Sequence, residues 1–254
     1  MDVTDRFSDR VEAYTRYRPG YPEALVDALG LGGLDVADVG AGTGVFTALL
    51  APRAGRVVAL EPNTPMREAL QRALPGVQAL PGRAEATGLP DASVDVLTCA
   101  QAFHWFDPEA FRAEAARVLR PGGRVAVVFN ERVERSPFDA AYEAFLHRWS
   151  TDYAAVDHRH AVAALDGVLG DGRTEVAWPH AQVFDEPGLV GRILSCSYIP
   201  GAGHPDHHAA TVAAGHLFRA FARQGTVHLA YDARLFTGPI RSPGSPSTAA
   251  ARRR

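Results

Sequence analysis

The sequence predicts an α/β fold, in which a doubly wound and mostly parallel sheet is covered by helices on both faces. Apolar runs of four to six residues alternate with helical stretches between residues 36 and 129, the pattern of strands buried on both sides. A glycine-rich turn follows the first run and leads into a helix. Ligands of such sheets bind beyond the carboxyl ends of the strands, so the loops after the first, second and fourth strands are expected to share one crevice.

The expected elements follow the chain in order. Strands are expected at 36–39, 56–60, 77–80, 95–99, 124–129 and 226–237, the last of them antiparallel. Helices are expected at 5–18, from Pro22 to Gly30, at 47–50, 64–74, 108–119 and 136–149, and after Asp206. Thr64 is expected to cap the 64–74 helix, with Pro65 at its first position. Residues 151–172 are ambiguous, and 175–184 has partial strand character.

Composition excludes several classes of function. The 254 residues carry a net charge of −3, so the chain has no excess of positive charge for nucleic acid. All 26 cationic residues are arginine, which rules out a Schiff-base lysine. The two cysteines, Cys99 and Cys196, form no CxxC pair, which favours a reducing compartment. The N-terminus does not resemble a signal peptide, and no run approaches the roughly 18 apolar residues of a membrane span. We therefore expect a cytoplasmic protein without a membrane partner.

The glycine-rich turn, DVGAGTG at 38–44, is the strongest single motif. Gly40, Gly42 and Gly44 allow positive φ and close approach of a ligand to the backbone. Val45 stands where the third glycine of the dinucleotide fingerprint would be. Glu61 follows the second strand at a distance that suits binding of ribose hydroxyls in either class of ligand. By themselves these residues leave the ligand open.

Further segments carry a resemblance to a known family. They are LEPN at 60–63, GRAEATGLPDASVDVL at 82–97, AQAFHWFD at 100–107 and RVLRPGG at 117–123, together with YTRYRPGYP at 14–22. With the glycine turn, they resemble the class I S-adenosylmethionine-dependent methyltransferases, and more narrowly the small-molecule branch of the trans-aconitate and ubiquinone-type enzymes. The resemblance covers roughly residues 7–130 and implies a Rossmann-like sheet.

The resemblance also implies a site for S-adenosylmethionine, with S-adenosylhomocysteine as product. Asp38 and the backbone of Gly40, Ala41, Gly42 and Gly44 would face its amino-acid part, with the Asp38 carboxylate pairing with the ammonium group. Glu61 would accept hydrogen bonds from the ribose, with Pro62 in the same loop. The remaining implied contacts are Asn63, Met66, Ala84 and Glu85 around the adenine, Gln101 near the methionine portion, and Tyr14 and Arg18 closing over the cofactor, with Arg18 on its carboxylate.

His104 has two interpretations. It follows the fourth strand, so it is a candidate general base near the acceptor. The alternative, which we favour, is a histidine that packs under Trp105 and holds the loop. The histidines at 204–208 are expected to lie at a helix start and at the surface, and we expect no metal site.

We expect one domain over residues 1–240. Its parts are cap helices at 5–30, a cofactor-binding core at 34–130, a substrate-side segment at 131–225 and the last strand at 226–237, followed by a disordered tail at 241–254. Five aromatic side chains of the substrate-side segment suit either an apolar lid or core packing: Phe138, Tyr142, Phe145, Trp149 and Tyr153.

The expected function is methyl transfer to a small organic acceptor, in keeping with natural-product tailoring by analogy alone. Two alternatives stay open. One is an enzyme of the same fold that uses the cofactor for cyclisation or decarboxylation. The other is a cofactor-binding module without catalysis. A dehydrogenase is disfavoured by Val45. The acceptor, the atom that is methylated and the oligomeric state are not determined by the sequence.

Overall fold

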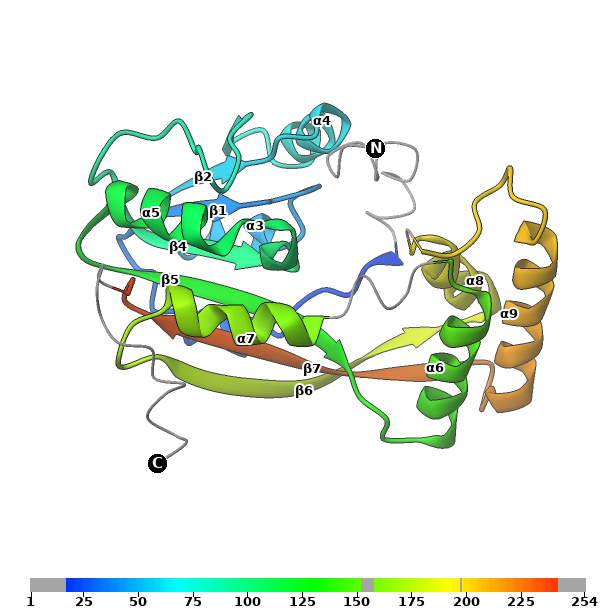
Figure 1. Cartoon of the computed structure of the whole chain (residues 1–254). Helices are drawn as coiled ribbons and strands as arrows, with labels where there is room; N and C mark the ends of the chain where they lie inside the picture. The colour runs from blue at the N-terminus through cyan, green and yellow to red at the C-terminus, as the bar shows by residue number, and fades with distance from the viewer. Residues whose placement is uncertain (1–16, 152–157, 197, 242–254) are drawn as a thin grey trace. The chain divides into compact units, whose positions relative to one another are not determined.

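The computed structural model describes residues 17–151, 158–196 and 198–241 (Figure 1). The chain divides into two compact units. We call residues 21–129, 158–178 and 234–254 the core unit, and residues 1–20, 130–157 and 179–233 the helical unit. The single domain expected over 1–240 stays a prediction. The tail expected from 241 lies outside the described residues, except for Arg241. Within these ranges the helices are too short or too polar to cross a membrane.

In the part of the chain that the structure describes, seven strands form the sheet, in the order β3-β2-β1-β4-β5-β7-β6. They are β1 (Asp35–Val39), β2 (Arg56–Leu60), β3 (Gln78–Leu80), β4 (Val94–Ala100), β5 (Leu119–Arg132), β6 (Thr174–Phe184) and β7 (Val227–Gly238). The pairs β3-β2, β2-β1, β1-β4 and β4-β5 are parallel, whereas β5-β7-β6 is antiparallel. The predicted α/β class and the antiparallel last strand are confirmed. The strand order reverses between β1 and β4, and ligands of open α/β sheets bind beyond the carboxyl ends of the strands at such a switch point.

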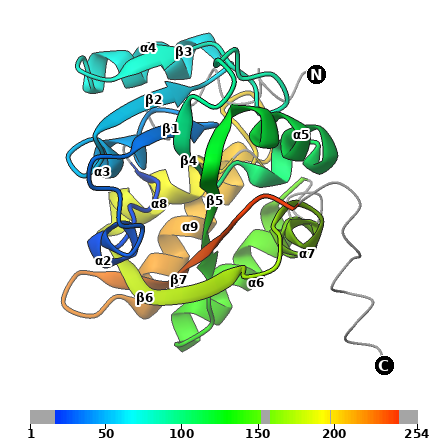
Figure 2. The same ribbon diagram turned by 90° about the vertical axis from the view of Figure 1, so that its left-hand side faces the viewer.

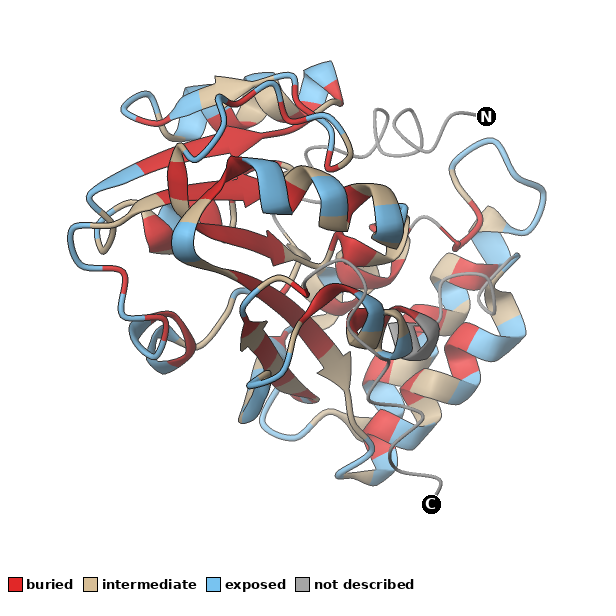
Figure 3. Cartoon of the chain, turned by 60° about the vertical axis from the view of Figure 1, so that its left-hand side comes forward, coloured by how far each residue is buried: buried red, intermediate tan, exposed pale blue. Residues whose placement is uncertain are grey.

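Helices cover both faces of the sheet in the core unit. They are α2 (Glu23–Asp27), α3 (Thr47–Leu50), α4 (Thr64–Ala73), α5 (Pro108–Val118) and α7 (His158–Val168), with the short 3-10 helix η3 at Phe103–Trp105. In Figure 2, α5 and α7 lie on one face of the strands, and α2 and α3 on the other. Figure 3 shows β1, β2 and β4 buried along most of their length, as expected for strands covered on both sides.

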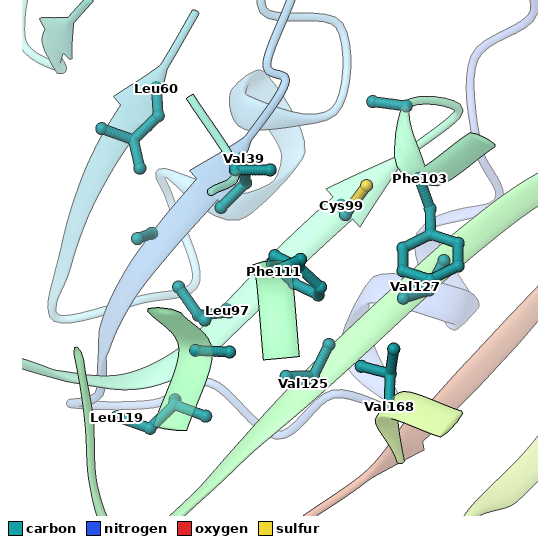
Figure 4. Packing of buried hydrophobic residues seen from close by; sticks show 14 of the residues in the cluster. Val39, Leu60, Leu97, Cys99, Phe103, Phe111, Leu119, Val125, Val127 and Val168 are labelled. Carbon is teal, nitrogen blue, oxygen red and sulfur yellow. The ribbon is translucent and has the colours of Figure 1, made fainter. Parts of the chain in front are cut away.

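One apolar cluster fills the space between the sheet and the α5–α7 face (Figure 4). Leu97 and Val127 of neighbouring parallel strands meet Phe111 of α5 and Val168 of α7, and each of these side chains is at most 1% exposed. Burial of this kind contributes about 25 cal/mol for each Å² of apolar surface removed from water. The core therefore holds β1 and β4 rigidly at the point where their loops begin.

Local differences from the predicted elements have identifiable causes. Asn63, and not Thr64, caps α4, because its Oδ1 accepts a hydrogen bond from Met66 N at 2.9 Å. The fifth strand is longer than the expected 124–129 and carries Asn130 near its end. The ambiguous stretch 151–172 contains α7.

The helical unit contains α6 (Pro137–Trp149), α8 (Glu186–Leu194) and α9 (His207–Phe221), which lie side by side in Figure 1. α8 was not predicted. It starts at the N-cap Asp185, whose Oδ1 accepts from Gly188 N at 2.8 Å, and Pro187 lies in its first turn. Phe138, Tyr142 and Phe145 of α6 are buried in the cluster that joins these helices. Core packing therefore accounts for these three aromatic side chains, while Tyr153 lies outside the described residues.

The segment 17–20 is held in the helical unit by backbone contacts and by one glycine. Asn130 Nδ2 donates to Gly20 O at 3.0 Å, and Gln182 Nε2 donates to Tyr17 O at 3.3 Å. A Cβ at Gly191 of α8 would clash with the Tyr17 ring. Glycine is therefore required at 191 so that the ring can lie against the helix.

We predict that Gly191→Ala lowers the melting temperature and speeds chymotrypsin cleavage after Tyr17, because the added methyl group displaces the ring. Alanine in a helix is otherwise favourable by about 1 kcal/mol, so a loss of stability would come from the lost packing. The double variant Gly191→Ala with Tyr17→Ala should recover part of the stability lost by Gly191→Ala. A Gly191→Ala protein more stable than the wild type would contradict this account.

Candidate functional site

The turn after β1 has the backbone geometry that the glycines predict. The φ angles are +70° at Gly40, +58° at Gly42 and +89° at Gly44, all in the left-handed region that favours glycine. A Cβ at Gly40 would lie 2.6 Å from Ala102 Cβ, and one at Gly44 would lie 2.9 Å from Leu70 Cγ. A Cβ at Gly42 would meet nothing within 4 Å. Gly40 and Gly44 thus allow close packing, whereas Gly42 leaves bare backbone beside open space.

The helix after the turn contributes less than expected. α3 has only four residues, so its dipole and its free N–H groups form a weak anion site. The donors and acceptors nearest the turn come instead from side chains at the ends of the neighbouring strands.

Asp38, near the end of β1, lies in the interior and is 1% exposed. Its Oδ2 accepts from Thr47 Oγ1 at 2.6 Å, and its Oδ1 accepts from Thr98 Oγ1 at 2.8 Å. Burial raises the pKa of this carboxyl to about 6, although the two threonine hydroxyls favour the charged form. Asp38 therefore links the turn to α3 and β4. The predicted pairing with an ammonium group stays a prediction.

Glu61, just after β2, holds two loops together. Its Oε2 accepts from Gly42 N and its Oε1 from Asn63 N, each at 2.8 Å. Burial raises the pKa of this carboxyl, and the two backbone donors oppose the shift. Arg67 Nη1 donates to Glu61 O at 2.7 Å and so fixes the backbone that carries the acid. A carboxylate has about four lone-pair sites, so Glu61 retains acceptor capacity for a hydroxyl-bearing ligand beside Gly42.

The loop after β4 reaches the same glycine turn. Ala102 lies next to Gly40, as the close Cβ distance shows, and Gln101 adopts a φ of +55°. A left-handed conformation at a residue other than glycine costs about 1–3 kcal/mol and often marks a functional position. The expectation that the loops after β1, β2 and β4 lie together is met at Gly40 and Gly42. The predicted contact of Gln101 with the cofactor is not tested.

The loop after β3 is held by contacts that the sequence analysis missed. Thr87 N and Oγ1 both donate to Glu114 Oε1, at 2.8 and 2.6 Å. Arg117, followed by the contacts from Thr87, lowers the pKa of Glu114 to about 2. This anchoring fixes the neighbouring Ala84, which is buried, and Glu85, whose Oε1 accepts from Asp107 N at 2.9 Å. Neither residue's predicted adenine contact is tested.

His104 lies on η3, and its ring centroid is 4.5 Å from that of Trp105. Phe103 beside it is buried against Phe106 and Phe111. This arrangement agrees with the interpretation that His104 packs in the loop, while the general-base interpretation stays a prediction.

The other predicted contacts have partners within the chain, belong to the helical unit or fall outside the described residues, and none of their contacts with the cofactor is tested. Asn63 caps α4, and Met66 is buried behind it. Pro62 O accepts from Arg67. Arg18 belongs to the helical unit, where its charge lowers the pKa of Cys196. Tyr14 lies outside the described residues.

Thr43, inside the motif, is a polar residue that the sequence analysis did not single out. It is 5% exposed, and its Oγ1 makes no hydrogen bond within the part of the chain that the structure describes. Across the same residues, no group of three histidine, cysteine or acidic side chains is arranged to hold a metal ion.

We predict that Asp38→Asn makes stability less dependent on pH. The folded protein holds the Asp38 proton more tightly than the unfolded chain, since the pKa rises from 3.8 to about 6. The wild-type free energy of unfolding should therefore fall as pH rises through this window. Asparagine removes this titration, so the variant should gain stability relative to wild type between pH 4 and pH 7, by at most roughly 3 kcal/mol.

Urea unfolding at the two pH values measures the effect of Asp38→Asn. Asp171→Asn, at an exposed position of the same unit, is the control and should show little change. If the difference in free energy of unfolding between Asp38→Asn and wild type is the same at both pH values, Asp38 does not titrate between them.

Comparison with known proteins gives a consistent result. Residues 37–127 match the family model described as a methyltransferase domain. An uncharacterized methyltransferase of Mycobacterium tuberculosis is 47% identical over 135 residues, which are 53% of this chain and 56% of the relative. A methyltransferase-like protein of Schizosaccharomyces pombe is 29% identical over 202 residues, covering 76% of this chain and 70% of that protein. The chain thus spans little more than half the length of the mycobacterial relative.

Solved structures agree with the fold. A type II methyltransferase structure from Anaeromyxobacter dehalogenans has a TM-score of 0.68 at 26% identity, and the match covers 89% of this chain and 99% of that one. The YcgJ protein of Bacillus subtilis has a TM-score of 0.55 at 20% identity over 87% of this chain and 98% of its own, which supports the fold alone. Together with the glycine turn and the Glu61 loop, these matches support a class I S-adenosylmethionine-dependent methyltransferase: residues 37–127 are similar to a methyltransferase domain, and the described chain has the fold of solved methyltransferases.

Proposed function

We propose that the protein transfers a methyl group from S-adenosylmethionine to a small organic acceptor. The observation that carries the proposal is the hydrogen bond from Gly42 N to Glu61 Oε2, which joins a bare glycine backbone to a buried acid. This pairing suits a ligand that has both a polar chain for the backbone and hydroxyl groups for the acid. The residues present therefore fit the cofactor of the family.

When bound, S-adenosylmethionine supplies a methyl group already activated by a sulfonium. The chain's own residues bind and position the reactants. Glu61 would accept the ribose hydroxyls, and the backbone around Gly42 would hold the methionine end. Asp38 fixes this turn through Thr47 and Thr98. Because alignment of the reacting atoms provides much of the rate in such a reaction, a rigid turn is more important than a strong base.

The acceptor class is supported by two indirect observations. The net charge of −3 gives the chain no excess of cations for a nucleic acid. A Beutenbergia cavernae relative that is 34% identical over 133 residues, about half of either chain, is named demethylmenaquinone methyltransferase, which names an organic molecule as its acceptor. Natural-product tailoring and a cytoplasmic location remain parts of this proposal.

Methyl transfer can be tested directly with S-adenosylmethionine carrying a labelled methyl group and a panel of phenols, carboxylic acids and amines. The expected result is release of S-adenosylhomocysteine with an equal amount of labelled product. Release of S-adenosylhomocysteine without a methylated product would favour a different chemistry on the same fold. Tight cofactor binding without turnover of any acceptor would favour a binding module.

We predict that Gly42→Ala weakens binding of S-adenosylmethionine by roughly tenfold. The methyl group would occupy the open space beside the turn, and the φ of +58° would cost a residue other than glycine about 1–2 kcal/mol. Calorimetric titration measures the affinity. Gly32→Ala is the matched control, because its Cβ also meets nothing within 4 Å and no positive φ is required there. An unchanged affinity despite lower stability would mean that the turn is only structural.

The role of His104 can be tested by His104→Ala at saturating cofactor. If the imidazole is the general base, the rate of transfer should fall by about 10²–10⁴-fold, and added imidazole should restore part of it. If His104 only packs against Trp105, the variant should melt earlier but keep a rate within a few-fold of wild type. Retention of the rate would remove the base role.

A further inference from the structure

The helical unit contains a buried cation that the proposed reaction does not use. Arg192 of α8 is 2% exposed and is among the largest fully buried side chains. Its Nη1 contacts Cys196 Sγ at 2.9 Å, while its Nε has no hydrogen-bond partner within residues 17–151, 158–196 and 198–241. Among the residues that the structure describes, no aspartate or glutamate forms an ion pair with it. A buried charge without a counter-ion is strongly unfavourable.

Tyr142 of α6 provides a second unused donor in the same cluster. It is fully buried, and its hydroxyl makes no hydrogen bond within the described chain. Burial raises the pKa of this hydroxyl, so it is a neutral donor near pH 7. Tyr142 belongs to the same buried cluster as Cys196, the residue that Arg192 contacts, so the two side chains lie in one part of the helical unit. By contrast, the hydroxyl of nearby Tyr231 donates to Gln182 Oε1 at 3.0 Å.

The surroundings add positive charge. Arg18 and Arg132, like Arg192, lower the pKa of Cys196, so all three guanidinium groups act on one buried point. Arg132 is paired with Glu143. Asp139 of α6 accepts from Ser136 and from Ala230 N. These two acids therefore have other partners, and neither forms an ion pair with Arg192 in the part of the chain that the structure describes.

We propose that Arg192 and Tyr142 form a binding site for the carboxylate of a small organic anion. A guanidinium matches the two oxygens of a carboxylate, and a tyrosine hydroxyl can donate to the same group. The site is assigned within the helical unit alone. That this anion is the methyl acceptor is a second step, which rests on the proposed function.

The cysteine offers a competing explanation of the buried charge. Burial raises the pKa of the Cys196 thiol, but Arg192, Arg18, Tyr198 and Arg132 together lower it to about 7. A thiolate at Cys196 would then be an internal counter-ion, and no external anion would be needed. The two explanations differ in what Cys196→Ser does.

Binding should be measured calorimetrically on the full chain at constant ionic strength, with succinate, citrate and 4-hydroxybenzoate as probes and their uncharged amides as controls. At least one carboxylate should bind and raise the melting temperature, and its amide should not. Arg192→Met should weaken that binding at least tenfold, and Tyr142→Phe several-fold. Binding by none of the three carboxylates, or equal affinity in Arg192→Met, would overturn the proposal.

Stability of the unliganded variants gives an independent readout. Tyr142→Phe should be at least as stable as wild type, because it removes a buried hydroxyl that has no hydrogen-bond partner among the residues that the structure describes. The matched control, Tyr231→Phe, loses the bond to Gln182 and should melt earlier while still binding the carboxylate. A loss of stability in Tyr142→Phe as large as in Tyr231→Phe would show that the Tyr142 hydroxyl is structural.

Cys196→Ser separates the internal counter-ion from the external one. On the proposal, the variant keeps its stability and its carboxylate binding. If Cys196→Ser loses much of its stability, and if the wild-type protein binds none of the carboxylates, the Cys196 thiolate is the counter-ion of Arg192. Affinity for S-adenosylmethionine, measured in each variant, should not change. If a carboxylate binds but is not methylated, the anion site is supported, and only the proposal that this anion is the methyl acceptor is overturned.

Discussion

A buried carboxylate at the end of the first strand is the interaction on which the candidate site depends. Asp38 is 1% exposed, and each of its oxygens accepts a hydrogen bond from one threonine hydroxyl. Thr47 lies on α3 and Thr98 on β4, so three elements are fixed relative to one another by a single side chain. Because an unsatisfied carboxylate would be costly in this interior, the arrangement allows little variation in the path of the glycine turn.

The glycine turn held in this way is closely packed on one side and open on the other. Toward the core, Gly40 and Gly44 pack too closely for any side chain. On the other side, Gly42 is bare and donates its N–H to Glu61. The loops after β2 and β4 are brought to the turn by the parallel order of the strands, not by sequence proximity. The candidate binding face is therefore formed mainly by backbone atoms and contains few side chains.

The helical unit follows a different principle. Its interior of aromatic and aliphatic side chains also contains the cationic Arg192 and the Tyr142 hydroxyl, which has no hydrogen-bond partner among the described residues. A core selected only for stability would contain apolar groups at both positions, since replacing unpaired buried polar groups is commonly neutral or stabilising. The cost of retaining Arg192 is the physical argument for a ligand in this unit.

Much of the core unit could be predicted from the sequence. Strands β1, β2 and β4, the alternation with helices and the glycines at positive φ all follow from local signals, namely apolar runs, glycine spacing and helix-starting prolines. The cap of α4 was assigned one residue too late, because Asn63 and Thr64 are both good caps and only the hydrogen bond to Met66 N distinguishes them. The helix α8 was missed because Pro187 and Gly188 interrupt its start, where the Asp185 cap compensates.

The sequence by itself determined the parallel strands β1, β2 and β4, the glycine turn and the resemblance to a methyltransferase family, because these depend on short motifs with fixed spacing. Only the tertiary structure showed that Asp38 is held by Thr47 and Thr98, that Glu114 anchors Thr87, and that Arg192 is buried in contact with Cys196. The contacts of Asp38 with Thr98 and of Thr87 with Glu114 join elements that are far apart in the chain, and no local pattern encodes such a pairing. The burial and the hydrogen-bond partners of polar side chains depend on how the folded chain packs, and in this protein they identify the candidate sites.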